Sequence, residues 1–155
     1  MTNFFPFYYQ TLETDCGPTC LKMIAEFYSR EFNVEPMINN QRIKIRGASL
    51  LDICNAAEKI GLIPKAFQAK AGFLKRIELP AILYWNQSHF IVLFAIEQNR
   101  FHIADPQNGL RIISKAELKR NWEWIPNGKN QEGVALTFSI GLDAMSKTRS
   151  KITDL

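Results

Sequence analysis

The sequence is poor in cysteine, and its cysteines cannot all pair with one another. Cys16, Cys20 and Cys54 make an odd count in 155 residues, which argues against a closed disulfide framework. Cys16 and Cys20 are four residues apart, a spacing that suits one helix face, and no second Cys/His pair at metal-ligand spacing follows them. We therefore expect reduced thiols, a cytoplasmic location, and neither a structural metal nor a cofactor.

Long apolar runs are also missing from the sequence. No stretch approaches the ~20 apolar residues that a membrane helix needs, and the aromatic N-terminus lacks the positive leading segment of a signal peptide. With 46% hydrophobic and 22% charged residues the composition is that of a soluble globular protein. We expect one domain over residues 1–140, followed at 141–155 by a polar, basic linker or disordered tail.

Positive charge has no strong focus along the chain. The net charge is +4, and the basic residues are scattered except for Lys147, Arg149 and Lys151 near the C-terminus. Proteins that bind nucleic acids usually gather such charge on one face or stripe. We expect no nucleic-acid partner.

The first half of the chain carries helical patterns. Asp15 is a suitable N-cap before a Gly-Pro turn, and apolar residues then recur at helical spacing, which predicts a helix over residues 16–30. Residues 32–45 are less regular but leave room for a short helix. A further helix is predicted from Ser49, which begins a capping box, to Gly61, which favours a helix end.

The second half reads as a run of strands joined by turns. The almost continuous apolar character of residues 89–97 predicts a central strand that is buried on both faces. Other strands are expected at 63–69, 80–85, 101–104, 110–113 and 133–139, with a helical turn at 72–77 and a helix at 114–122. Helices followed by hairpin-connected strands indicate an α+β fold with a mostly antiparallel sheet.

Cys16 stands at the start of the first predicted helix, between Asp15 and Gly17. Unpaired N–H groups and the dipole at a helix start stabilise a thiolate, which is the nucleophilic form of cysteine. The alternative is a buried cysteine that packs as a small hydrophobic residue. That alternative is the one we expect for Cys20 and Cys54, which lie within apolar helix faces.

A thiol nucleophile needs a base within hydrogen-bond reach, and the chain has two histidines. His89 follows a turn and begins a strand, so it can project into a cleft, whereas His102 lies inside a strand and is expected at the surface or in packing. Asp105 follows His89 by 16 residues, which fits two adjacent antiparallel strands and brings both residues to the same end of a hairpin. There the carboxylate can orient the imidazole, unless Asp105 merely opens a turn.

Gln10 precedes Cys16 by six residues. Its amide could donate to the oxyanion that forms during acyl transfer, with the Cys16 backbone N–H as a second donor. A single glutamine carries little weight from sequence alone.

Taken together, these residues have a familiar order. The run from Gln10 to Leu21, QTLETDCGPTCL, resembles the cysteine box of the bacteriocin-processing peptidases, the papain-like domains at the N-terminus of peptide-exporting ABC transporters. The similarity extends over about residues 7–139, and its further matches are to the family's second helix (GASL at 47–50, with Ala57 and Gly61), its histidine box (PAI at 80–82 and HFIV at 89–92) and its aspartate box (Asp105-Pro106 with Gly109).

The resemblance implies a papain-like cysteine peptidase with Cys16 as nucleophile, His89 as base and acid, Asp105 as orienter and Gln10 as oxyanion donor. It implies cleavage after a Gly-Gly pair that ends an amphipathic leader, whose apolar face docks in a hydrophobic groove of the enzyme. Thr19, where the family often has alanine, is a mild departure.

The resemblance also implies partners. These are the peptide precursor and the membrane and ATPase domains of an ABC transporter at the cytoplasmic face of the inner membrane. Because the chain stops at Leu155, we expect an excised domain, with a stand-alone peptidase as the alternative. Two other functions stay open: a non-hydrolytic module that binds leaders for export, and an acyltransferase that uses the same three residues.

Overall fold

The computed structural model describes residues 4–141, so the tail predicted at 141–155 lies outside the described residues apart from Gly141. The first half is helical, as predicted, and the irregular stretch holds two short helices instead of one. Its elements are η1 (Glu13–Asp15), α1 (Cys16–Phe27), α2 (Glu35–Ile38), α3 (Gln41–Arg46) and α4 (Leu50–Lys59). Within the described range, none of the helices combines the length and the apolar character needed to cross a bilayer.

Helix α1 begins at Cys16, as predicted, but ends at Phe27 and not at Arg30. Ser29 has a φ of 55°, a left-handed conformation that a continuing helix cannot accommodate. Asp15 stands at the N-cap position, yet its carboxylate does not cap the helix. It accepts a hydrogen bond from the Leu12 N–H at 3.0 Å instead, because the short helix η1 places that N–H beside it.

The start of α4 follows the predicted capping box. The Ser49 hydroxyl accepts from the Asp52 N–H at 3.1 Å, and the Asp52 carboxylate accepts from the Ser49 N–H at 2.8 Å. Arg42 of α3 donates to the same carboxylate at 2.9 Å, which lowers the pKa of Asp52 to about 2. This contact joins α3 to α4.

All strand pairs of the described residues are antiparallel. The strands are β1 (Leu62–Ala69), β2 (Ala81–Trp85), β3 (His89–Glu97), β4 (Arg100–Asp105), β5 (Gly109–Ser114), β6 (Ile125–Asn127) and β7 (Asn130–Ile140). Their order is β1-β7-β2-β3-β4-β5, and β6 pairs with β7 alone. The sequence did not predict β6, and β7 is longer than expected. The last strand also lies inside the sheet, between β1 and β2.

The central strand β3 separates two cores. Phe90 and Val92 pack with α1 on one face, whereas Ile91 and Leu93 pack on the other face with Trp122 of α5 (Lys115–Trp122). Burial on both faces is therefore confirmed for residues 90–93, while residues 94–96 are half-buried. The predicted turn at 72–77 is the 3₁₀ helix η2 (Ala71–Arg76), which joins the second core.

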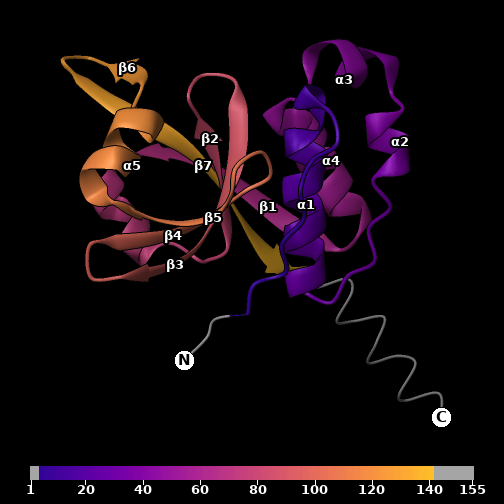
Figure 1. The fold of residues 1–155 in the computed structure, drawn as a ribbon, viewed down its shortest axis with the longest axis horizontal. Helices are drawn as coiled ribbons and strands as arrows, with labels where there is room; N and C mark the ends of the chain where they lie inside the picture. The colour runs from indigo at the N-terminus through magenta and orange to yellow at the C-terminus, as the bar shows by residue number, and fades with distance from the viewer. Residues whose placement is uncertain (1–3, 142–155) are drawn as a thin grey trace.

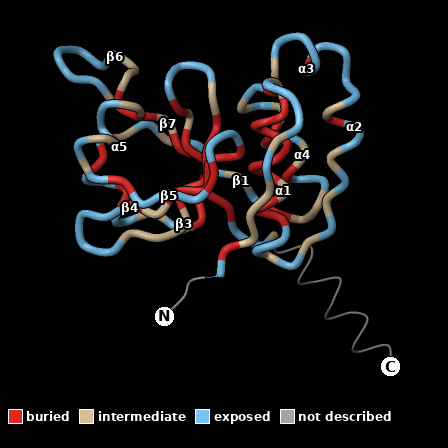
Figure 2. The backbone as a smooth tube through the Cα atoms, viewed as in Figure 1, coloured by how far each residue is buried: buried red, intermediate tan, exposed pale blue. Residues whose placement is uncertain are grey.

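The helices and the sheet form two neighbouring parts of the molecule. Figure 1 shows α1 to α4 gathered beside the sheet, with α5 on the far side of the strands. The buried residues run along α1 and through the central strands (Figure 2). The start of α1 and the start of β3 meet where the two parts adjoin, and that junction positions the site.

Candidate active site

Cys16 and His89 open into the same cavity, which has a volume of about 420 Å³. One wall comes from the helical part, through Glu13, Thr14 and residues 45–48. The opposite wall comes from the sheet, through Tyr84, residues 87–90 and Gln107. We call these the helical wall and the sheet wall. Cys16 is the first residue of α1 and is buried, so its thiol lies at a helix start as predicted.

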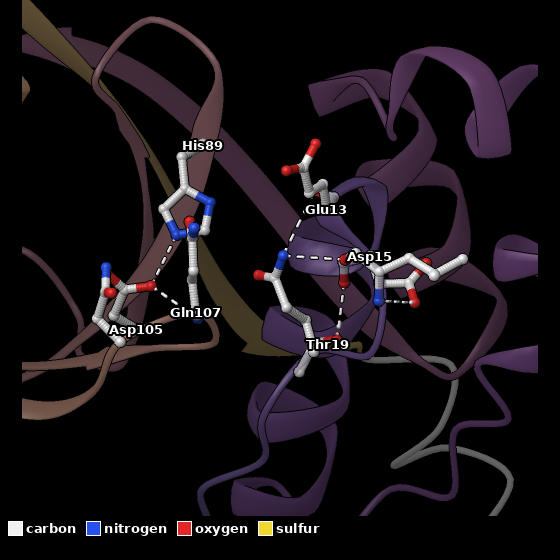
Figure 3. Close-up of polar contacts among 9 residues, drawn as sticks. Glu13, Asp15, Thr19, His89, Asp105 and Gln107 are labelled. Atoms are coloured by element: carbon white, nitrogen blue, oxygen red, sulfur yellow. Dashed lines mark hydrogen bonds and ion pairs between the residues drawn. The ribbon is translucent and has the colours of Figure 1, made fainter.

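On the sheet wall, His89 and Asp105 form the predicted pair. His89 Nε2 lies 2.7 Å from Asp105 Oδ1, which leaves Nδ1 as the ring nitrogen available to Cys16. The two residues come from the adjacent strands β3 and β4, which pair in antiparallel register. Figure 3 shows this pair across from Glu13, Asp15 and Thr19 of the helical part.

The Asp105 carboxylate is held by two further donors that the sequence reasoning missed. The Gln107 N–H donates to Oδ1 at 2.9 Å, and the Asn108 side-chain amide donates to Oδ2 at 3.0 Å. Asp105 is only 2% exposed, so every donor that reaches it restricts its orientation. The turn sequence at 105–109 could have predicted the Gln107 contact, because an aspartate in a turn commonly accepts a hydrogen bond from the backbone N–H two residues on.

The close approach of Tyr9 fixes the far end of that turn. Gly109 has a φ of 100°, and a Cβ at this position would lie 3.0 Å from the Tyr9 hydroxyl oxygen. One residue further on, the Gln10 N–H donates to the Pro106 carbonyl at 2.9 Å. The N-terminal segment therefore braces the turn that carries Asp105.

The charges of the site favour an ion pair. Burial alone would lower the pKa of His89, but hydrogen bonds with Asp105 and Cys16 outweigh it and raise that pKa to about 9. For Asp105, burial raises the pKa, and the hydrogen bonds from His89 and Asn108 more than offset this, so the pKa lies below its ordinary value. At neutral pH the site therefore holds an imidazolium beside a carboxylate.

Gln10 lies near the nucleophile in the chain but is turned to the backbone. Its Nε2 donates to the Leu12 carbonyl at 2.9 Å and lies 3.4 Å from the Glu13 carbonyl. Its Oε1 is buried, with no hydrogen-bond partner among the described residues. Gln10 is not among the described residues that line the cavity. Its role as an oxyanion donor stays a prediction that requires the amide to turn.

The other sulfur and imidazole groups lie elsewhere. Cys20 is fully buried in the core, as predicted, and burial raises the pKa of its thiol well above the ordinary value. Cys54 is half-buried, which is less than expected. His102 lies beside Phe94 with ring centroids 5.9 Å apart and is absent from the cavity lining. Over residues 4–141, no three His, Cys, Asp or Glu side chains gather closely enough to hold a metal ion.

The chain has the papain-like fold, in which helices pack on an antiparallel sheet. A cysteine at the start of the first long helix and a histidine from the sheet face one cavity. The chain belongs to the peptidase C39 family, whose model matches residues 5–125. It is thus a member of a family of cysteine peptidases.

Curated relatives extend the family match. The chain is 32% identical over 143 residues to the colicin V secretion/processing ATP-binding protein CvaB of Escherichia coli, covering 92% of this chain and 19% of that protein. It is 28% identical over 120 residues to the lactococcin-G-processing and transport ATP-binding protein LagD of Lactococcus lactis, covering 74% of this chain and 17% of the relative. The chain thus spans less than a fifth of the length of these relatives.

Solved structures share the fold. A double glycine motif protease from an AMS/PCAT transporter, solved with the leader peptide, has a TM-score of 0.76 at 26% identity, covering 87% of this chain and 91% of that one. The peptidase domain of Streptococcus ComA has a TM-score of 0.75 at 19% identity, covering 88% and 99%. The second likeness concerns the fold alone.

Proposed function

We propose that this chain is a thiol endopeptidase domain that removes the leader of a secreted peptide precursor by cutting after a Gly-Gly pair. The observation that carries the proposal is the shared cavity of Cys16 and His89, with His89 held by Asp105 at 2.7 Å. The names of the relatives join processing to secretion or transport, and one solved structure is a double glycine motif protease; both support the substrate class.

The reaction follows from the roles of these residues. The Cys16 thiolate attacks the carbonyl carbon of the second glycine, and the carbonyl electron pair moves to the oxygen. When the tetrahedral intermediate collapses, the C–N bond breaks and the His89 imidazolium gives its proton to the leaving amine, so a thioester remains. Neutral His89 then takes a proton from water as the water oxygen attacks the thioester, and collapse releases the leader and regenerates the ion pair. Asp105 holds the imidazole throughout, and the Cys16 N–H and the Gln10 amide are the proposed oxyanion donors.

The preference for glycine has a physical reason in the two walls. The helical wall brings Gly47 and Ala48 to the cavity, while Tyr84 and Phe90 line the sheet wall opposite. We propose that the Gly-Gly pair lies between these residues beside the thiolate, because glycine brings no side chain that the two walls would have to accommodate.

We infer that the apolar face of the leader docks beside β5. Leu110 is 55% exposed and Ile112 is 50% exposed, and both point to the same side of this strand because they are two residues apart. β5 is a terminal strand of the sheet and follows the Asp105 turn directly, so a docked helix there lies next to the cleft. Tyr9, which is also exposed and touches this turn, extends the surface.

Coupling to export is the remaining part of the proposal. The named relatives are ATP-binding proteins of secretion or transport, and this chain spans only a small part of them. We propose that it acts with the membrane and ATPase domains of an ABC transporter at the cytoplasmic face of the inner membrane, and that the peptide precursor is its substrate. The alternative is a leader-binding module without turnover.

The test uses synthetic leader peptides that end in Gly-Gly followed by a short cargo segment. Mass spectrometry should find cleavage after the second glycine, and replacement of either glycine by leucine should block cleavage. Ile112→Asp should weaken leader binding by roughly 1–3 kcal/mol, the value of one buried apolar side chain. Ile63→Asp, at an exposed isoleucine on β1, is the matched control and should bind normally. Tight binding of leaders without any cleavage would favour the binding module.

A further inference from the structure

Arg46 is a charged residue of the helical wall that the reaction does not use. It is the last residue of α3, its side chain is exposed, and it lines the same cavity as Cys16 and His89. Gly47, which follows it, has a φ of 79° and turns the chain along this wall. A substrate in the cleft therefore lies beside Arg46.

The charge of Arg46 is not neutralised within the described part of the chain. Arg42 of the same helix is bound to Asp52, whereas Arg46 makes no ion pair with any residue of the 4–141 range. Glu13 also lines the helical wall and likewise has no ion-pair partner in that range. The wall thus offers one cation and one anion, separately, to whatever lies in the cleft.

We propose that Arg46 is a specificity-determining residue whose guanidinium binds an acidic side chain close to the scissile bond. The proposal rests on the proposed function, since it assumes a peptide in this cleft. The planar guanidinium donates two parallel hydrogen bonds to a carboxylate. Glu13 repels a carboxylate and attracts a basic side chain. A substrate whose acidic side chain lies at Arg46 and whose basic side chain lies at Glu13 therefore binds more tightly than one with these charges exchanged.

A structural role for Arg46 is a competing explanation that the test must separate from this one. A cation in the last turn of a helix interacts favourably with the helix dipole, and Lys44 shares that position in α3. Such a role would affect folding stability, and it would not make the enzyme distinguish one substrate charge from another. Reversal of charge preference is therefore the diagnostic readout.

The experiment is a charge scan of the Gly-Gly leader peptide. Glu, Gln or Lys is placed singly at each of the three positions before the glycine pair and the three positions after the cut, and kcat and KM are measured for each peptide. At one or more positions the wild type should prefer Glu over Gln by about fivefold in kcat/KM, the scale of one partly exposed ion pair. The preference should appear in KM, because the ion pair forms equally in ground state and transition state, and it should shrink in high salt.

Two variants decide the assignment. Arg46→Glu should transfer the preference at that position from Glu to Lys, and Arg46→Gln should remove it. Lys44→Gln, from the same helix but outside the cavity lining, should keep the wild-type preference. The same scan is repeated as binding to the Cys16→Ala protein, so that a chain without peptidase activity still reports the preference.

The outcomes separate the two proposals. Equal kcat/KM and equal binding for all charge variants would overturn the role of Arg46 and leave the peptidase standing. A preference that survives Arg46→Glu would overturn it as well. Binding that follows charge as expected, together with no cleavage of any peptide, would sink the peptidase proposal and support the role of Arg46.

Discussion

The two walls of the cleft differ in how completely their polar groups are paired. On the sheet wall, the Asp105 carboxylate accepts hydrogen bonds from His89, the Gln107 N–H and Asn108. On the helical wall, neither Glu13 nor Arg46 forms an ion pair with a described residue, and Gln10, which lies outside the cavity lining, donates to the backbone carbonyl of Leu12. His89 and Asp105 are therefore paired before the substrate binds, whereas the charges of Glu13 and Arg46 have no ion-pair partner among the described residues.

This difference has a chemical reason. A proton-transfer pair must be oriented at every turnover, and buried charges are stable only when they are hydrogen-bonded. An oxyanion donor or a substrate-binding charge is satisfied only in the complex, so it must find another partner or water in the free enzyme. The sheet wall thus holds its catalytic pair in place through hydrogen bonds, and the helical wall keeps two charges available to a substrate.

The largest expected effect comes from removing a reacting group from either side. Cys16→Ala and His89→Ala should each lower leader cleavage by on the order of 10⁴-fold or more, while circular dichroism and the melting temperature show an intact fold. Peptide turnover is followed by chromatography. His102→Ala is the matched control and should retain activity, because His102 does not line the cavity. Loss of activity in His102→Ala with retention in His89→Ala would show that the base is assigned to the wrong histidine.

A smaller effect is expected from Gln10, the proposed oxyanion donor, whose amide donates to the Leu12 carbonyl in this structure. Gln10→Ala should reduce kcat by on the order of 10²–10³, the usual effect of one such donor. KM should hardly change, since the charge develops only in the transition state. Gln10→Glu, which keeps the size but lacks the amide donor, is the companion variant. A loss confined to KM would mean that Gln10 binds substrate and does not stabilise the oxyanion.

The mildest effect concerns the sheet wall and is read from a pH profile. His89 must carry a proton to release the amine, and its pKa is about 9, so kcat/KM should persist at neutral pH and fall as the pH rises through about 9. Asp105→Asn removes a carboxylate that raises this pKa. The variant should keep partial activity, because the imidazole remains, and its alkaline limb should move down by about one pH unit. An unchanged limb would show that Asp105 does not set the proton affinity of His89.

Much of this arrangement could be predicted from local patterns. The helix start at Cys16, the hairpin spacing of His89 and Asp105, and the capping box at Ser49 all depend on residues close in sequence. The Gln10 contacts could not be predicted in the same way. Which backbone carbonyl the half-buried Gln10 amide selects depends on the course of the η1 turn, and the sequence carries no periodic signal for it.

The strand order could not be predicted for a different reason. The sequence predicts a strand at 133–139, but alternation gives only the exposed and buried faces of a strand and not its neighbours. The place of β7 between β1 and β2 results from contacts across the whole chain. The strand β6 was missed because it is three residues long and contains Pro126, which weakens any strand signal.

The position of β7 inside the sheet determines when the sheet can be completed during synthesis of the chain. Strand β1 pairs in the described structure only with β7, and the first residue of β1, Leu62, lies opposite the last residue of β7, Ile140. The hairpins of β2 to β5 can close as they leave the ribosome because their partners are neighbours in sequence. The β1 edge and the open side of β2 stay unpaired until the last strand emerges, and exposed strand edges are where nascent chains associate wrongly. Translation must therefore pass residue 140 before the sheet is complete. Only then can the helical part, which carries the Cys16 thiol, pack on the complete sheet.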